Sequence, residues 1–424
     1  MIEKVLERYV PALSLYARLE KSGTAFLDSS MQGALGRRSY ICMVPYRTYG
    51  PDEGDAASVI DSRPEGGVMA GYVSYDHGLE MHGMCSRHPP SDIPSFLLTD
   101  YDILVTDDPE SRELTVLCIG RALPDTEELA MVETAVSAAK EPDMPDGEAW
   151  TAVDDTSRED FEKAVQKARE MMRDGEFYVI NLTRTVRVSS EMDPFDAFLR
   201  LRSLSPSPFG AYLDCGRLQI LSSSMELLLE ARGRDVHTRP IKGTCPRTGT
   251  AERDRLLLEG LLSSEKDRSE LLMVTDMERN DMNRFCEPGS VKVESFFEPE
   301  IYATVCHTVS DIVGRASEGV GYGRMLECMF PGGSITGAPK ESCMEAIDSL
   351  EKCRRGLYTG SIGIFTDDMA EVNIAIRTMI HTEGEYSMGV GGGITFESDP
   401  AKEYDETVDK SRAMLSSLGE THGA

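Results

Sequence analysis

A lysine in a short glycine-containing run is the residue of this chain that most invites a chemical interpretation. Lys242 lies within residues 239–244, Arg-Pro-Ile-Lys-Gly-Thr. An amine held in such a glycine turn could contact a substrate. Taken alone, however, a lysine in a polar segment between a strand and a helix is usually solvated. Whether Lys242 has a functional role therefore has to be judged together with the other polar residues of the chain.

A predicted helix from residue 265 to about residue 284 carries a carboxylate on its apolar face. Glu270 is in register with apolar residues three, four and seven positions later, and these spacings share one helical face. Glutamate is rarely buried without a partner, so this position suggests an ion or a ligand. An ion pair with Lys266 one turn earlier is the structural alternative.

A second predicted helix begins at the Asp-Pro pair 399–400, a cap followed by proline at the first helical position. Glu403, Glu406 and Lys410 follow one stripe of this helix. Taken alone, the stripe is typical of a solvated, salt-bridged face. Together with Glu270, however, Glu403 and Glu406 supply three hard oxygen ligands, which would suit Mg²⁺.

Two glycine runs, residues 331–340 and 389–394, fail as nucleotide-binding motifs. The first has Ala338 where a phosphate loop needs lysine, and the second has Ile394 where a dinucleotide fingerprint needs its last glycine. Consecutive glycines let backbone N–H groups approach an anion closely, which favours a cradle for carboxylates. Tight turns are the alternative.

Composition limits the class of protein. The 424 residues include 44 basic and 73 acidic side chains, a formal charge of −29, which argues against nucleic-acid or anionic-membrane partners. The first residues are charged where a signal peptide would be apolar, and no apolar run reaches membrane-spanning length. We therefore expect a cytoplasmic protein without a membrane partner.

The ten cysteines are scattered without metal-binding spacing. Cys118 and Cys245 fall near the Gly-x-Cys-x-Gly elbow of a glutaminase nucleophile, but Val116 and Arg247 stand where the elbow needs glycine. We therefore expect glutamine hydrolysis to be absent from this chain.

The chain divides at an acidic, turn-rich segment, residues 141–156, which predicts a connection between an amino-terminal region, 1–140, and a larger region, 157–420. A helix is predicted from Ser157 to the Asp-Gly pair 174–175, followed by an alternating strand from Tyr178 to Val188. Helices and mainly hairpin-connected strands interleave without βαβ regularity. This pattern favours an α+β fold, which could be one intertwined unit.

From about residue 157 onward the chain resembles the chorismate-utilising enzymes. The run 239–244 matches their Pro-Ile-x-Gly-Thr motif, in which aminodeoxychorismate synthases carry Lys at x and anthranilate synthases carry Ala. Further matching blocks are 181–183, 222–226, 279–281, 307–310, 332–337, 359–363, 376–378 and 403–406. Before residue 157 the match is thinner, at 26–29, 36–40 and 71–76.

The resemblance is greatest to aminodeoxychorismate synthase component I, and it implies a fold of mainly antiparallel sheets packed face to face with helices outside, in layers α/β/β/α. It implies conversion of chorismate and ammonia to 4-amino-4-deoxychorismate, a step toward p-aminobenzoate and folate-type products, with ammonia from a separate glutamine amidotransferase subunit. The alternatives are anthranilate synthase component I, or, in a different class, a non-catalytic paralogue that binds chorismate or an amino acid.

The resemblance also assigns roles. Lys242 would attack C2 of chorismate, Glu226 would be the general acid at C4, and Glu270, Glu403 and Glu406 would hold Mg²⁺. The implied substrate-binding residues are Gly243, Thr244, Thr336, Arg377, Gly391, Gly392, Gly393 and Lys410. A lysine with its usual pKa of about 10.4 is protonated near neutrality, so the site must lower this pKa and must let Glu226 hold a proton.

Two departures narrow the expected chemistry. Val179 stands where isochorismate- and salicylate-forming relatives present a polar side chain that activates water, so those reactions are not expected. Residues 205–210, Ser-Pro-Ser-Pro-Phe-Gly, resemble the tryptophan-feedback run of anthranilate synthases with its Asn and Met replaced. Tryptophan inhibition is therefore not expected.

Overall fold

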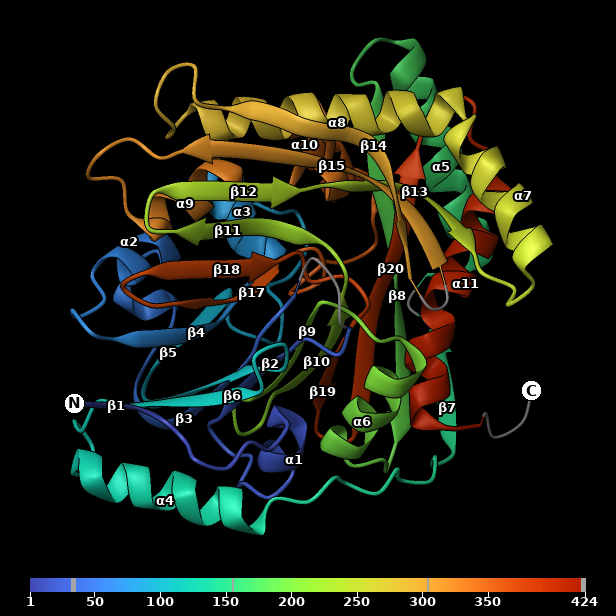
Figure 1. Cartoon of the computed structure of the whole chain (residues 1–424). Helices are drawn as coiled ribbons and strands as arrows, with labels where there is room; N and C mark the ends of the chain where they lie inside the picture. Colours follow the sequence, from blue (N-terminus) through green and yellow to red (C-terminus); the bar gives the residue numbers. More distant parts are fainter. Residues whose placement is uncertain (32–35, 155, 303–304, 421–424) are drawn as a thin grey trace.

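The computed structural model describes residues 1–31, 36–154, 156–302 and 305–420 (Figure 1). Its α-helices are α1 (Ala12–Tyr16), α2 (Ala56–Asp61), α3 (Tyr75–Met81), α4 (Asp125–Ala138), α5 (Arg158–Arg173), α6 (Pro194–Leu204), α7 (Ala251–Leu262), α8 (Glu265–Asn283), α9 (Tyr322–Met329), α10 (Lys340–Leu350) and α11 (Pro400–Leu418). Two short 3-10 helices are η1 (Pro51–Glu53) and η2 (Gly333–Ile335). Among the described residues, no helix is long and apolar enough to cross a membrane.

The strands are β1 (Ile2–Val5), β2 (Ala25–Asp28), β3 (Ser39–Tyr49), β4 (Val68–Val73), β5 (Phe96–Asp108), β6 (Glu113–Cys118), β7 (Trp150–Asp154), β8 (Val179–Ser190), β9 (Phe209–Asp214), β10 (Gln219–Ser224), β11 (Leu227–Arg232), β12 (Asp235–Arg239), β13 (Ile241–Pro246), β14 (Lys292–Ile301), β15 (Val305–Arg315), β16 (Gly337–Ala338), β17 (Ser361–Phe365), β18 (Met369–Asn373), β19 (Thr378–Thr382) and β20 (Glu385–Ile394). The described pairings between them are all antiparallel, which confirms the predicted α+β class.

The strands form one continuous hydrogen-bonded sheet, and we call the order in which they pair the strand ladder. From β15 the pairing runs through β12, β11, β18, β17, β4, β5, β3, β2, β9, β10, β19, β20 and β8. The amino-terminal strands β2 to β5 therefore lie between β17 and β9, which belong to the larger region. The segment 141–156 thus separates two parts of the sequence but not two sheets.

Among the described residues, three large apolar cores define the layers, and a fourth, small one lies between α7, β13 and β15. One core consists of strand residues and the loops beside them, such as Ala25, Tyr40 and Ile220, and lies between the packed sheet faces. A second core joins α5, α8, α9 and α10 to the sheet, and a third joins α1, α4, α6 and α11 to it. Helices therefore cover the outer faces of strands that pack on one another (Figure 1).

The two helices that carry the predicted metal ligands are fixed by side-chain caps. The Ser264 side chain accepts a hydrogen bond from the Asp267 N–H at the start of α8. Asp399 accepts from two N–H groups at the start of α11, and Pro400 occupies the first turn. These caps satisfy backbone donors that a helix start leaves free, as the sequence predicted.

Local structure differs from one expectation, the loop at Lys242, and from one alternative, the tight turn at residues 389–394. Lys242 lies in strand β13 and not in a loop, because residues on both sides of it pair with β15. The glycine run 389–394 is not a tight turn but the second half of β20. In the predicted connection, β7 pairs with β8, and Asp155 lies outside the described residues.

Candidate active site

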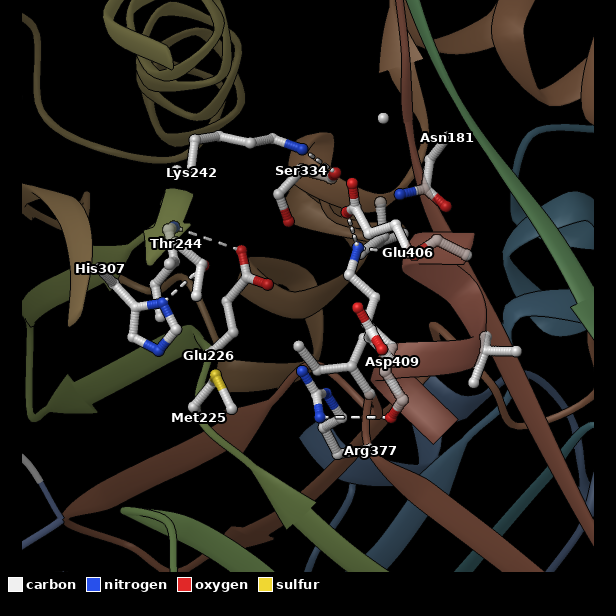
Figure 2. A pocket seen from close by; sticks show the side chains of 18 of the residues that line it. Asn181, Met225, Glu226, Lys242, Thr244, His307, Ser334, Arg377, Glu406 and Asp409 are labelled. Carbon is white, nitrogen blue, oxygen red and sulfur yellow. Dashed lines mark hydrogen bonds and ion pairs between the residues drawn. The ribbon is translucent and has the colours of Figure 1, made fainter. Parts of the chain in front are cut away.

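A cavity of about 760 Å³ lies where the two ends of the strand ladder meet. One end contributes β13 and β15, and the other contributes β8 and β20; α8 and α11 complete the wall. Lys242, Glu226, His307, Arg377 and Glu406 lie around this one space (Figure 2). The fold therefore brings together side chains that are far apart in the sequence.

The Lys242 amine reaches across the cavity and donates to the Ser334 carbonyl oxygen, 2.9 Å away (Figure 2). Gly243 forms a bulge between the paired residues Lys242 and Thr244. Its φ of +71° favours glycine, and an added Cβ would lie 2.9 Å from a methyl carbon of Leu261. The bulge therefore fixes how Lys242 leaves the strand.

Burial lowers the pKa of the Lys242 amine, and the charge of Lys410 lowers it further, while Glu270, Glu226 and Glu406 oppose this shift. The net shift is downward. A lowered pKa increases the fraction of neutral amine, which is the form that attacks carbon.

Glu226 lies in the turn between β10 and β11 and is 4% exposed. The Ile241 N–H donates weakly to its Oε1 over 3.5 Å. Burial raises the pKa of the Glu226 carboxyl, and the Ser334 hydroxyl and the Lys242 charge reduce this rise without cancelling it. Burial thus lowers the pKa of the Lys242 amine and raises the pKa of the Glu226 carboxyl. An amine nucleophile and a general acid require these directions.

Glu270 and Glu403 are the more buried of the three predicted metal ligands. Oε1 of Glu270 is buried and has no hydrogen-bond partner among the described residues, although the Lys266 amine lies 3.8 Å away. Burial raises the pKa of both carboxyls. A buried carboxylate oxygen without a donor is suited to a cation.

Glu406 differs, because its Oε1 lies 2.7 Å from Nζ of Lys410. Burial would raise the pKa of Glu406, but the charge of Lys410 and its hydrogen bond keep it below its usual value. Lys410 also donates to the Gly391 carbonyl oxygen over 2.8 Å. Glu406 is therefore the carboxylate of the set that holds its charge most readily.

The three carboxylates fit Mg²⁺ by the chemistry of their donors, since they offer oxygen ligands from two helices. The partnerless oxygen of Glu270 supports this fit. Within the described residues, no three His, Cys, Asp or Glu side chains are grouped closely enough to hold a metal ion. In this arrangement the three carboxylates therefore do not form a closed metal site. Their binding of Mg²⁺ stays a prediction.

A second basic group lies at the opposite wall of the cavity. Arg377 donates to the Lys410 carbonyl oxygen over 3.2 Å, and burial lowers its pKa. Its φ of +51° is in the left-handed region, which is uncommon outside glycine. Arg377 and Lys410 give this wall two cations that could receive carboxylates.

The glycines of β20 expose their backbone to the cavity and leave space in it, because they have no side chains. β19 pairs with β20 only up to Met388. Residues 389–394 therefore have no partner in β19. Gly391 and Gly393 line the cavity. A Cβ at Gly393 would lie 3.6 Å from Nζ of Lys242 and 3.8 Å from Oε2 of Glu270, so a side chain there would enter the space between these groups.

Two predicted substrate-binding residues lie outside the cavity lining. Thr336 is fully buried, and its hydroxyl donates to the Gly332 carbonyl oxygen over 2.9 Å. Gly392 points between Glu403 and Glu406, whose oxygens lie 3.7 and 3.4 Å from an added Cβ. Gly243 and Thr244 do line the cavity. Direct contact of Thr336 and Gly392 with a substrate stays a prediction.

The structure adds His307, Ser334 and Asn181 to the site. Nδ1 of His307 lies 2.8 Å from the Thr244 hydroxyl, and burial lowers the pKa of this imidazole to about 4. His307 and Asn181 belong to motif blocks that the sequence pointed out. The signal was present, but a block of matching residues does not say which side chain faces the ligand.

Val179 is buried at the start of β8, with a methyl carbon 4.0 Å from a Cβ added at Gly393. It therefore lies near the Lys242 amine, where the sequence placed it. The Val179 side chain itself is hydrocarbon and offers no polar group that could activate water.

Residues 50–416 match the family described as chorismate binding enzyme. Anthranilate synthase component 1 1 of Haloarcula marismortui is 36% identical over 372 residues, which cover 83% of this chain and 76% of that protein. Aminodeoxychorismate synthase component 1 of Bacillus subtilis is 35% identical over 364 residues, which cover 84% of this chain and 77% of that protein.

The crystal structure of anthranilate synthase component I from Streptococcus pneumoniae matches with a TM-score of 0.77 and 25% identity, covering 97% of this chain and 98% of that chain. This match confirms the fold expected from the resemblance. The two named activities appear at nearly equal identity, so similarity alone does not choose between them.

Proposed function

We propose that this chain, which belongs to the family of chorismate binding enzymes, is an aminodeoxychorismate synthase component I. It would replace the C4 hydroxyl of chorismate by an amino group. The observation that carries this proposal is the Lys242 amine, which enters the cavity and has a lowered pKa. Its neighbour Glu226 has a raised pKa. An anthranilate-forming enzyme needs no amine at position 242.

In the first half-reaction, the neutral amine of Lys242 attacks C2 of the ring. The ring double bonds shift and the C4–O bond breaks, while Glu226 gives its proton to the departing hydroxyl so that water leaves. Arg377, Lys410 and the backbone at Gly391 would bind substrate carboxylates and orient the ring. Both side chains start this step in the protonation state that burial favours.

In the second half-reaction, ammonia attacks C4. The double bonds shift back, the bond between C2 and Lys242 breaks, and one proton of the incoming ammonia returns to Glu226. The net change is loss of water and gain of an amino group at C4, with the enolpyruvyl group retained. Lys242 and Glu226 are both regenerated.

The residues proposed to hold Mg²⁺ are Glu270, Glu403 and Glu406. When bound, Mg²⁺ would supply positive charge that holds and polarises the ring carboxylate. Glu270 and Glu403 would contribute partly buried carboxylates, and Glu406, which is paired with Lys410, would share its carboxylate between that amine and the ion.

Removal of Mg²⁺ by a chelator is expected to abolish turnover, and adding Mg²⁺ back should restore it. Glu403→Ala should raise the Mg²⁺ concentration required or eliminate activity, because one ligand is lost. The matched control is Glu397→Ala, at an acidic position before α11 and outside the cavity lining. Full activity of Glu403→Ala without added metal would show that Glu403 is not a metal ligand and belongs to a solvated, salt-bridged face of α11.

The nitrogen source gives a second test. We expect the isolated chain to use ammonium salts and to gain glutamine dependence only with a separate amidotransferase subunit, because no cysteine of the chain fits a glutaminase elbow. The assay compares ammonium and glutamine as donors for the purified chain. Glutamine turnover by the chain alone would contradict this assignment.

Anthranilate synthase component I is the second candidate, because a relative with that name is as similar as the aminodeoxychorismate synthase. A non-catalytic binding paralogue is the third. The presence of both a candidate nucleophile and a candidate acid in one cavity supports an enzyme. Product analysis separates the first two candidates, and absence of turnover with ammonium would favour the third.

A further inference from the structure

A second glutamate lies behind Glu226, outside the cavity. Glu278 is on α8, two turns beyond Glu270, and is 2% exposed. The ammonium of Lys340 on α10 does not pair with it; this group bonds to Asp281 over 2.7 Å and to the Met329 carbonyl oxygen over 3.1 Å. Glu278 is thus a buried carboxyl without a direct ion pair among the described residues, which disfavours its charged form.

The hydroxyl of Thr238 connects Glu278 to the turn that carries Glu226. Its Oγ1 lies 2.8 Å from Oε2 of Glu278 and 3.5 Å from the Leu227 carbonyl oxygen. A hydroxyl has one hydrogen, and both neighbours are acceptors if Glu278 is ionised. If Glu278 carries a proton, it can donate to Thr238, which can then donate to Leu227. A protonated Glu278 therefore frees the Thr238 hydrogen to point toward the Leu227 carbonyl oxygen, over the longer distance of 3.5 Å.

Charges around Glu278 agree with this arrangement. Burial raises its pKa to about 8; the charges of Asp281 and, when it is ionised, of Glu226 add to the rise, and Thr238 and Lys340 oppose it. The largest of these contributions come from α8, α10, β12 and the Glu226 turn. Near neutral pH most molecules therefore hold the proton on Glu278.

The Glu226 turn needs such support because regular pairing is interrupted there. The registers of β11 with β12 and with β18 both shift just after Leu227. The Glu226 carbonyl oxygen accepts from the Ile374 N–H over 3.0 Å. The Thr238 contact lies at the next peptide, on the same carboxyl-terminal side of Glu226. On the other side the Glu226 N–H donates to the Ser224 hydroxyl over 3.3 Å.

We propose that Glu278 is a positioning residue which, through Thr238 and the Leu227 carbonyl, holds the general acid Glu226 in place. The inference rests on the proposed role of Glu226 and concerns no contact of Glu278 with the substrate. It applies equally if the product is anthranilate, because the acid at C4 is needed in either reaction.

Two substitutions separate a donor role from simple packing. Glu278→Gln keeps an N–H that can donate to Thr238, so its kcat should stay within about 3-fold of wild type. Glu278→Met fills similar space without a donor, so we expect kcat to fall about 10-fold, with KM for chorismate nearly unchanged, as for a misplaced catalytic group. Wild-type kcat in Glu278→Met, or an equal loss in both variants, would overturn the proposal.

Thr238→Val tests the link itself. It removes the hydroxyl at similar volume, so it should reproduce the kcat loss of Glu278→Met. The double variant should lose no more than either single variant, because all three break one chain of contacts. Additive losses would show that the two residues act separately and would overturn the proposed connection.

Thermal melting tests the proton on Glu278 without any turnover. In the unfolded chain this glutamate has a pKa of about 4.3, and in the folded chain it has a pKa of about 8. The folded form thus retains a proton that the unfolded form releases, so wild type loses stability relative to Glu278→Gln as pH rises from 4.3 to 8. We expect the variant to melt above wild type at pH 8.5, with a smaller difference at pH 5.

A melting difference that does not change between these pH values would contradict a proton held by Glu278. Because melting needs neither chorismate nor Mg²⁺, this result is independent of the proposed reaction. If wild type does not catalyse the reaction but its melting still depends on pH as expected, the proposed function is rejected. The conclusion that Glu278 is a buried, protonated acid then stands. The two failures can therefore be told apart.

Discussion

Lys242→Ala is expected to lose aminodeoxychorismate formation by roughly 10³-fold or more, the scale on which removal of a covalent nucleophile acts. The amine occupies C2 and directs ammonia to C4. Without it, ammonia itself can reach C2, so a trace of C2-aminated product or anthranilate is expected. Chromatography of the products formed from chorismate and ammonium measures both effects.

Lys242→Arg is the matched control, because it keeps a positive charge at the same position. A guanidinium stays protonated and cannot act as the nucleophile, so this variant should also fail to make aminodeoxychorismate. If Lys242→Arg is active, the charge matters and the covalent step does not. Wild-type rates in Lys242→Ala would remove Lys242 from the reaction altogether.

Glu226→Gln is expected to cut turnover by roughly 10²-fold or more, the usual effect of losing a general acid, while chorismate binding is kept. The amide has nearly the same shape as the carboxyl but cannot release a proton. Turnover and the dissociation constant for chorismate should therefore be measured on the same preparation.

Glu230→Gln provides a control on the neighbouring strand β11. Its carboxylate lies 3.1 Å from Nε of Arg232 and outside the cavity lining, so the substitution should leave turnover close to wild type. Unchanged turnover of Glu226→Gln together with weaker chorismate binding would show that Glu226 only positions the substrate.

Local signals predicted the elements that position the site. Ser157 begins α5 and Asp174 ends it, and the Asp-Pro pair at 399–400 starts α11, as the sequence indicated. α8 begins at Glu265 as predicted. Capping residues act within one turn of the chain, so they can be recognised without tertiary structure.

The meeting of the two ladder ends could not be predicted from local signals. It depends on pairings such as β17 with β4, which join residues almost 300 positions apart. The strand at Lys242 was missed because glycine usually marks a turn, whereas Gly243 forms a bulge inside β13. The strand formed by the run 389–394 was missed for a similar reason, because its glycines suggested a turn but lie within β20.

Some site residues could likewise be predicted from the sequence, whereas others depend on tertiary packing. Motif resemblance selected Lys242, Glu226 and Arg377, which line one cavity. The burial of Thr336 and the placement of Glu278 depend on side-chain packing between elements. Glu278 is in no motif block that carried the resemblance, so only its contact with Thr238 linked it to the site.

The most direct test of the account is the identity of the product that the wild-type chain makes from chorismate and ammonium. We predict 4-amino-4-deoxychorismate, detected as p-aminobenzoate after a lyase is added, together with a chorismate-derived mass adduct on the peptide that contains Lys242 after trapping. Anthranilate as the main product, with no adduct on that peptide, would contradict covalent catalysis by Lys242 and would make the chain an anthranilate synthase component I.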